Sequence, residues 1–310
     1  MVREQRDSLA HISQILPKVV SQDSGEQSSQ QTPKDQENMT DECTCRTCGK
    51  KFQGEVIRYL RFRPVRELRP PECPTCKAAR EQQEQKEREG ELENLRAYIR
   101  VKWRQGCGMP AELLAKNFNN WDKRYQREAY KAAFEWAKDF NLDAPRGYRS
   151  LIFYSDNPGV GKGHLMAAVV NYIIDNWKGY PREQRCPIRF ESGPSLVRRI
   201  RATYNIRRED DIHEREDEVY HSLAGVPLLL LDDVGKETPS SFTRETYWYI
   251  IDERVKSGLP MIISSRLRLE GSNSLVGLMG VDTVDRLYGM ARGLLIEMVG
   301  QSYRRRNAIP

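Results

Sequence analysis

The stretch that decides the fold is Ser155-Asp156-Asn157-Pro158-Gly159-Val160-Gly161-Lys162-Gly163-His164. It lies between an apolar segment at 151–154, which predicts a strand, and a segment at 165–177, which predicts a helix. A strand, a glycine-rich turn and a helix start place backbone N–H groups and the positive end of the helix around the phosphates of a nucleotide. Lys162 is expected to reach the terminal phosphates. The sequence therefore predicts an ATP-binding loop at residues 157–164.

The loop departs from the usual pattern GxxxxGK(S/T) at two positions. Asp156 stands where the first glycine is usual, and Gly163 replaces the hydroxyl residue that would contact Mg²⁺. A water can fill that position, because Mg²⁺ usually keeps several of its waters. We therefore expect ATP hydrolysis to be slow rather than absent. The side chain of His164 is expected to point away from the metal, and Asp156 is expected to face outward or to cap a backbone N–H group.

The second half of an ATP site is predicted at Leu228-Leu229-Leu230-Leu231-Asp232-Asp233. Consecutive leucines are typical of a parallel strand that is covered on both faces. Asp232, at the strand end, is placed to hold Mg²⁺ through water, and Asp233 is placed to polarise the attacking water as a general base. A helix N-cap or a solvated turn is the alternative for these acids. Their order and spacing after the loop favour the ATP site.

Strand and helix patterns alternate after the loop, which predicts an α/β domain with a parallel sheet. The predicted strands are 188–191, 228–232, 261–264 and 294–298, and the predicted helices are 195–204 and 243–256. Apolar and aromatic positions between Tyr125 and Phe140 predict a further helix before the loop.

Five of the seven cysteines fall between residues 43 and 76. Cys45-x2-Cys48 and Cys73-x2-Cys76 form two knuckles that can supply four thiolates to Zn²⁺. Cys43 could replace Cys45 as a ligand, although its spacing from Cys48 is poorer. Because so short a module has a small core, the metal would have to supply folding free energy.

Basic and aromatic residues alternate between the two knuckles, around Arg58, Tyr59, Arg61 and Phe62. This pattern suits a groove for single-stranded nucleic acid, with bases stacked on the aromatic rings. It equally suits a solvated ribbon whose rings pack against the zinc site, or a surface that docks on a protein partner.

The chain of 310 residues has room for two unequal domains. Residues 1–42 are polar and are expected to form a disordered tail, followed by a zinc-binding module at 43–77, a helical linker at 78–108 and an ATPase domain at 109–310. The net charge of +6 allows a polyanionic partner without requiring one. The sequence has neither a long apolar run nor an apolar leader, so we expect no membrane association and a cytoplasmic location.

With these residues in place, the region from about 106 to 306 resembles the bacterial and phage replicative helicase loaders, the DnaC/DnaI type of AAA+ ATPase. The matching pieces are Gly108-Met109-Pro110, Pro158-Gly159-Val160-Gly161-Lys162, Leu231-Asp232-Asp233-Val234-Gly235, Val284-Asp285-Arg286-Leu287 and Ser302-Tyr303-Arg304. The resemblance implies an AAA+ P-loop domain without a separate helical lid. It also implies an ATP-regulated protein that binds the replicative DNA helicase and single-stranded DNA. The zinc module and linker resemble the DnaI branch, in which that module engages the helicase.

The resemblance also implies roles for individual residues. Ser264 stands at the position of the polar sensor, where the family more often has Asn or Thr. Arg286 stands at the position of the arginine finger, which reaches the nucleotide of a neighbouring subunit and so requires self-association. The helix 195–204 stands at the position of the single-strand-binding element. The basic residues of this helix are Arg198, Arg199 and Arg201. Without the resemblance, the helix pattern predicts only a solvated basic face.

Two other functions remain open. A transposition helper ATPase of the IstB type shares the same ATPase core but acts on a transposase and double-stranded target DNA. A zinc-stabilised nucleic-acid adaptor would use the ATP loop only as a nucleotide-sensing switch. Preferential binding of single-stranded over double-stranded DNA at matched salt would favour a loader over the transposition helper. ATP turnover that depends on Asp233 would exclude the adaptor.

Overall fold

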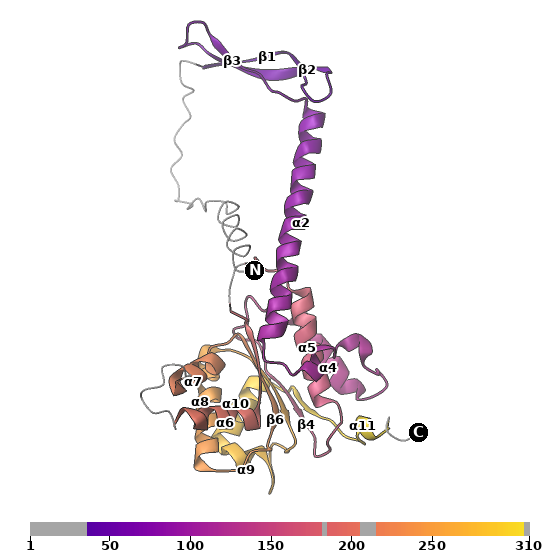
Figure 1. The fold of residues 1–310 in the computed structure, drawn as a ribbon, viewed down its shortest axis with the longest axis vertical. Helices are drawn as coiled ribbons and strands as arrows, with labels where there is room; N and C mark the ends of the chain where they lie inside the picture. The colour runs from indigo at the N-terminus through magenta and orange to yellow at the C-terminus, as the bar shows by residue number, and fades with distance from the viewer. Residues whose placement is uncertain (1–35, 182–184, 205–214, 307–310) are drawn as a thin grey trace, which may run out of the picture. The chain divides into compact units, whose positions relative to one another are not determined.

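The computed structural model describes residues 36–181, 185–204 and 215–306 (Figure 1). They fall into two compact units, which divide between residues 85 and 86. The boundary lies inside one continuous helix, α2 (Pro74–Gly106). This helix contains most of the predicted linker at 78–108. Among the described residues, no helix has the length and apolar character needed to cross a membrane.

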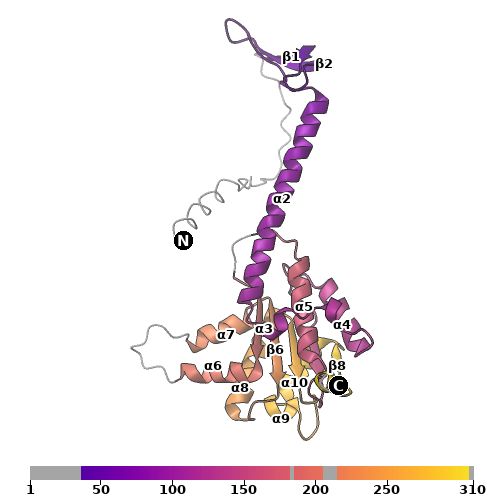
Figure 2. The ribbon, with the colours of Figure 1, turned by 45° about the vertical axis from the view of Figure 1, so that its right-hand side comes forward.

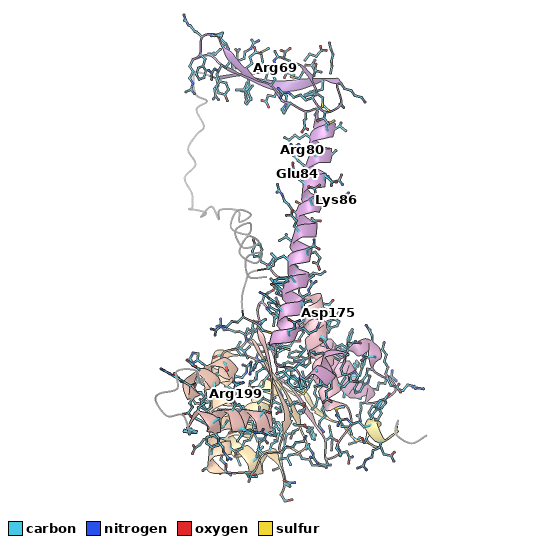
Figure 3. The ribbon with its side chains drawn as sticks, viewed as in Figure 1. Arg69, Arg80, Glu84, Lys86, Asp175 and Arg199 are labelled. Carbon is cyan, nitrogen blue, oxygen red and sulfur yellow. The ribbon has the colours of Figure 1, made fainter. Side chains whose placement is uncertain are left out.

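The first unit contains an antiparallel sheet of strands β1 (Gln36–Thr44), β2 (Lys51–Tyr59) and β3 (Arg66–Leu68), in that order. Arg69 joins the two edge strands through ion pairs to Asp41 at 2.8 Å and to Glu67 at 2.9 Å (Figure 3). The buried apolar side chains described in this unit are only Cys43, Cys45 and Val56. The unit therefore has too small a core to be stable by apolar burial alone.

Strand β1 corrects the predicted tail at 1–42. Residues 36–42 pair with β2 in an unbroken antiparallel register that runs from Gln36 opposite Tyr59 to Thr44 opposite Lys51. The polar composition of this segment hid the strand, because its backbone is ordered by hydrogen bonds to a partner strand and not by burial of its own side chains. Residues 1–35 of the predicted tail lie outside the described residues.

The second unit is built on a parallel five-stranded sheet of order β5-β6-β7-β4-β8, which confirms the predicted α/β fold class (Figure 2). Its strands are β4 (Leu151–Tyr154), β5 (Ile188–Ser192), β6 (Leu228–Val234), β7 (Met261–Ser265) and β8 (Leu295–Glu297). The chain leaves β4 for the far edge, returns as far as β7 and then crosses to β8 on the other side of β4. Ligands of such sheets bind beyond the carboxyl ends of the strands at the point of reversal, which here is β4.

Helices cover both faces of this sheet, and alternate residues of each strand point to opposite layers. Leu228 and Leu230 pack in one apolar cluster, whereas Leu229 and Leu231 pack in the other. The first layer contains α3 (Ala111–Leu114), η1 (Phe118–Asn120), α4 (Arg127–Asp139) and α5 (Lys162–Asn176). The second contains α6 (Gly193–Thr203), α7 (Glu216–Ala224), α8 (Ser241–Ser257), α9 (Leu275–Met279) and α10 (Val281–Ala291).

The last part of α2 packs against the end of α5. The Trp103 and Trp177 rings lie 4.5 Å apart between centroids, and Arg104 pairs with Asp175 (Figure 3). Arg100 donates to the carbonyl of Trp177. Because α5 begins at Lys162, the two ends of this helix connect the phosphate loop with the base of the linker helix.

Candidate nucleotide site and candidate zinc site

The phosphate loop has the backbone that its glycines predict. Gly159 and Gly161 adopt φ of 73° and 98°, which is the left-handed region where residues with a Cβ atom are strained. Gly161 is the N-cap of α5, and Lys162 is the first residue of the helix. The Lys162 ammonium is 3.3 Å from the carbonyl oxygen of Ser155 and 3.4 Å from that of Asn157. Burial lowers the pKa of Lys162 from its ordinary value, and an anion beside it would stabilise its charge.

The two acids and the expected sensor serine meet at the neighbouring strand ends. The Ser264 hydroxyl on β7 donates to the Asp232 carboxylate and accepts the backbone N–H of Asp233 at 2.9 Å. Burial raises the pKa of Asp232. Asp233 has φ of 54°, an uncommon value for a residue other than glycine, and its carboxylate pairs with Lys236. One hydroxyl thus fixes both acids at the carboxyl edge of the sheet.

The position of the missing hydroxyl also faces this group. A Cβ atom added to Gly163 would lie 3.6 Å from Oδ2 of Asp232, so a serine or threonine side chain there would adjoin the carboxylate. The residues therefore fit a magnesium ion that Asp232 holds directly or through water. Water would complete the shell that a hydroxyl usually shares, and octahedral Mg²⁺ tolerates that replacement.

Two segments that the sequence did not connect with the loop pack directly on it. A Cβ atom at Gly161 would come within 2.5 Å of the Trp121 ring, and one at Gly159 within 2.2 Å of the Ser302 hydroxyl. The N–H of Tyr303 donates to the carbonyl of Gly159 at 2.9 Å. Close packing is therefore a second reason for glycine at both positions. The Ser302-Tyr303-Arg304 motif was a signal for the second contact, whereas no local signal marks Trp121.

The side chains of His164 and of Asp156, which precedes the loop, face away from the acids. The His164 ring packs edge-to-face on Trp121, and its Nε2 lies 3.2 Å from the carbonyl oxygen of Asn117. Asp156 faces outward, as expected, and pairs with Arg268 at 2.9 Å. Neither side chain is directed at the space between Lys162 and Asp232.

Arg286 lies on α10 at the opposite edge of the sheet from the loop. It adjoins Gly147 and Gly258, which precede the amino ends of β4 and β7, in a cavity of about 270 Å³. Its guanidinium pairs with Asp252 of α8 at 3.0 Å. Arg286 is therefore not directed at the nucleotide site of its own chain.

The three arginines of α6 have different environments. Arg198 is exposed, whereas the Arg201 guanidinium lies 5.0 Å from the centroid of the Phe242 ring. Arg199 pairs with Glu191 at 2.7 Å and donates to Ser222, as its position on α6 allows (Figure 3). The structure thus leaves Arg198 and Arg201 on the surface and commits Arg199 to contacts within the fold.

Four cysteines of the first unit form the candidate metal site. The sulfur atoms of Cys45, Cys48, Cys73 and Cys76 all lie within 4.8 Å of one another. Those of Cys48 and Cys73 are 3.8 Å apart, and tetrahedral zinc with Zn–S bonds of about 2.3 Å requires a separation of roughly 3.8 Å. Backbone N–H groups of Cys73 and Cys48 lower the pKa of Cys45 to about 6, which favours its thiolate. The residues therefore fit Zn²⁺.

Cys43 is not part of this group. It is buried in β1 opposite Phe52, and a Cβ atom added to Gly54 would lie 3.2 Å from its sulfur. Of the two alternatives for the first knuckle, the structure brings Cys45 into the cluster.

A strand, phosphate loop and helix, a polar residue on the neighbouring strand β7 and an acid pair at the end of β6, the strand beyond it, define an α/β protein with a candidate nucleotide site and an added cysteine module. No model of a known protein family matches the chain. It is similar to the replicative helicase loader DnaC of Buchnera aphidicola, with 28% identity over 179 residues, 58% of this chain and 64% of the relative. It is also similar to DnaC of Escherichia coli K12, with 23% identity over 181 residues, 58% of this chain and 65% of the relative.

The chain thus spans less than two thirds of the length of these curated relatives. Two solved structures that it resembles are the DnaC helicase loader, at TM-score 0.46 and 23% identity, and DnaI, at TM-score 0.46 and 18% identity. The first covers 61% of this chain and 99% of the solved chain, and the second covers 65% and 98%. The resemblance to DnaC-type loaders that the motifs indicated is confirmed by the sequence comparison.

Proposed function

We propose that the protein is an ATP-binding loader of a replicative DNA helicase, which hydrolyses ATP slowly and is controlled by its partners. The observation that carries the proposal is that Lys162 lies at the carboxyl end of the sheet, where Asp232 and Ser264 form a hydrogen bond with each other. The sequence of the chain is in addition similar to DnaC loaders. Binding of the triphosphate would engage Lys162 and the acid pair together, which is how P-loop proteins sense the terminal phosphate.

The zinc module and the linker helix give the proposal its partner surface. The module exposes Leu60, Val65 and Leu68 beside its arginines. We infer that a protein partner packs on these exposed apolar side chains. We place the helicase contact here, single-stranded DNA at Arg198 and Arg201 of α6, and a neighbouring subunit at Arg286.

Co-expression with a replicative helicase tests the proposal. We expect the two proteins to co-purify, and we expect ATP to change the amount retained. Lys162→Ala, which removes the charge that binds the phosphates, should abolish the effect of ATP but leave the ATP-independent part of the interaction. Failure to co-purify with or without ATP would contradict a loader function. Tight ATP binding by the variant would show that the loop is not the site.

A further inference from the structure

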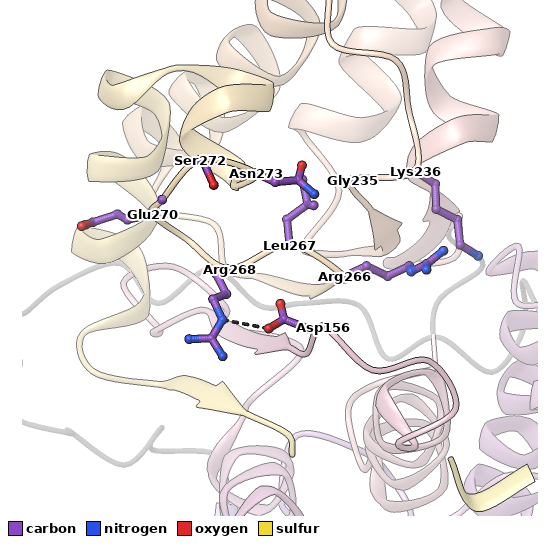
Figure 4. A pocket seen from close by; sticks show the side chains of 10 residues that line it. Asp156, Gly235, Lys236, Arg266, Leu267, Arg268, Glu270, Ser272 and Asn273 are labelled. Carbon is purple, nitrogen blue, oxygen red and sulfur yellow. Dashed lines mark hydrogen bonds and ion pairs between the residues drawn. The ribbon is translucent and has the colours of Figure 1, made fainter. Parts of the chain in front are cut away.

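A cavity of about 690 Å³ adjoins the candidate nucleotide site (Figure 4). It is formed by the first part of the phosphate loop, the turn after β6 and the turn after β7. Three basic side chains line it, together with two acidic ones. These residues are Lys236, Arg266, Arg268, Asp156 and Glu270.

Four of the five charged side chains already have partners. Arg268 pairs with Asp156 at 2.9 Å and with Glu297 at 3.0 Å. Lys236 pairs with Asp233, and Glu270 accepts from the Tyr288 hydroxyl. The fifth is Arg266, whose exposed side chain lines the cavity. In the part of the chain that the structure describes, no carboxylate pairs with it. The cavity thus presents one uncompensated guanidinium.

The backbone that holds Arg266 is firmly fixed. Its N–H donates to the carbonyl of Val234, and the hydroxyl of the preceding Ser265 donates to the same carbonyl at 2.9 Å. A Cβ atom at Gly235 would lie 2.6 Å from the Leu267 side chain, so the turns after β6 and β7 pack tightly on each other. This framework fixes the point in the cavity from which the Arg266 side chain extends.

The position of Arg266 points to the terminal phosphate as that ligand. Arg266 follows by two residues the serine that holds Asp232 and Asp233, and Figure 4 shows its side chain extending to the same side of the cavity as Lys236. The positive charges of Arg266 and Lys236 also contribute to the lowered pKa of Lys162, which places them within electrostatic reach of the phosphate-binding lysine. Guanidinium groups bind phosphate oxygens through paired, charge-assisted hydrogen bonds.

We propose that Arg266 binds the terminal phosphate of ATP held by its own chain and thereby distinguishes ATP from ADP. The inference rests on the proposed ATP site. It gives the terminal phosphate a basic ligand from the same chain. Arg286 cannot take this role within its own chain, because it lies near the amino ends of the strands.

Nucleotide affinity measured by calorimetry on the full-length protein tests the inference without relying on turnover. The probes are a non-hydrolysable ATP analogue and ADP, each with Mg²⁺. Loss of a charge-assisted contact predicts that Arg266→Ala weakens the analogue by about tenfold or more and ADP by less than about twofold. Arg146→Ala, an exposed arginine before the amino end of β4, is the matched control and should change neither affinity.

The outcomes separate the two hypotheses. Equal weakening of both nucleotides, or no change, overturns the role of Arg266 while leaving the ATP site standing. No change in nucleotide affinity together with weaker binding of a single-stranded oligonucleotide would assign the cavity to nucleic acid and also overturn it. If the unaltered protein binds neither nucleotide, the proposed function itself fails.

Discussion

Substitution of Gly163 by serine should restore the missing magnesium ligand. The added Cβ atom would lie 3.6 Å from Oδ2 of Asp232 and 3.8 Å from the nearest Leu113 methyl, so the side chain fits without displacing a neighbour. Its hydroxyl could then share with Asp232 an ion bound to the phosphates. The hydroxyl would replace a water that the ion must otherwise retain, and we expect affinity for Mg²⁺ in the presence of ATP to rise by roughly tenfold, or about 1.4 kcal/mol.

A magnesium titration of ATP hydrolysis at fixed ATP is the assay. Gly163→Ser should reach half-maximal rate at an about tenfold lower Mg²⁺ concentration. Gly163→Ala is the matched control, because it also adds a Cβ atom and removes the conformational freedom of glycine, by about 0.5–1 kcal/mol, but adds no hydroxyl. If serine and alanine have the same magnesium dependence, the reasoning that places this position beside the ion is refuted.

Three further predictions concern the other parts of the protein. Asp233→Asn should reduce single-site ATP turnover by at least about a hundredfold while ATP binding persists, because a general base contributes roughly 10²–10⁴-fold; turnover equal to that of the unaltered protein would remove this role. Arg286→Ala should change ATP affinity by less than about twofold, since its partner is Asp252 at the far edge, but should lower turnover in the assembled state by about 10³-fold if it acts across subunits; unchanged turnover would exclude the finger. Zinc chelation, or Cys73→Ser, should unfold residues 43–77 and abolish helicase binding while the melting of the ATPase unit stays unchanged, because the cysteine module depends on the metal for its stability; a retained complex, measured by co-purification, would move the partner surface elsewhere.

The parts of the site that the sequence could predict are those with local signals. Lys162 follows its glycines directly, and Asp232 ends a run of leucines that only a covered strand explains. Parallel strand ends meet at one edge, so the approach of Ser264 to Asp232 also follows from the strand pattern. The four cysteines were recognisable from spacing, and the structure only had to choose Cys45 over Cys43.

The features that escaped prediction depend on contacts between distant segments. Strand β1 exists through pairing with β2, and its polar side chains carry no apolar period. The contact of Trp121 with Gly161 joins two segments, and no local motif predicts that they pack together. Helices α7, α9 and α10 were not predicted as elements, although Arg286 on α10 was singled out. The ion pair between Arg286 and Asp252 likewise required the fold, since it joins two helices.

Loading of the helicase onto DNA tests the central claim most directly. The measurement is the amount of replicative helicase that becomes bound to a covalently closed single-stranded circle, which a preformed ring cannot thread without help. The account predicts that the protein with ATP increases this amount strongly, and that Lys162→Ala does not. Equal loading with the protein, with the variant and with helicase alone would contradict it.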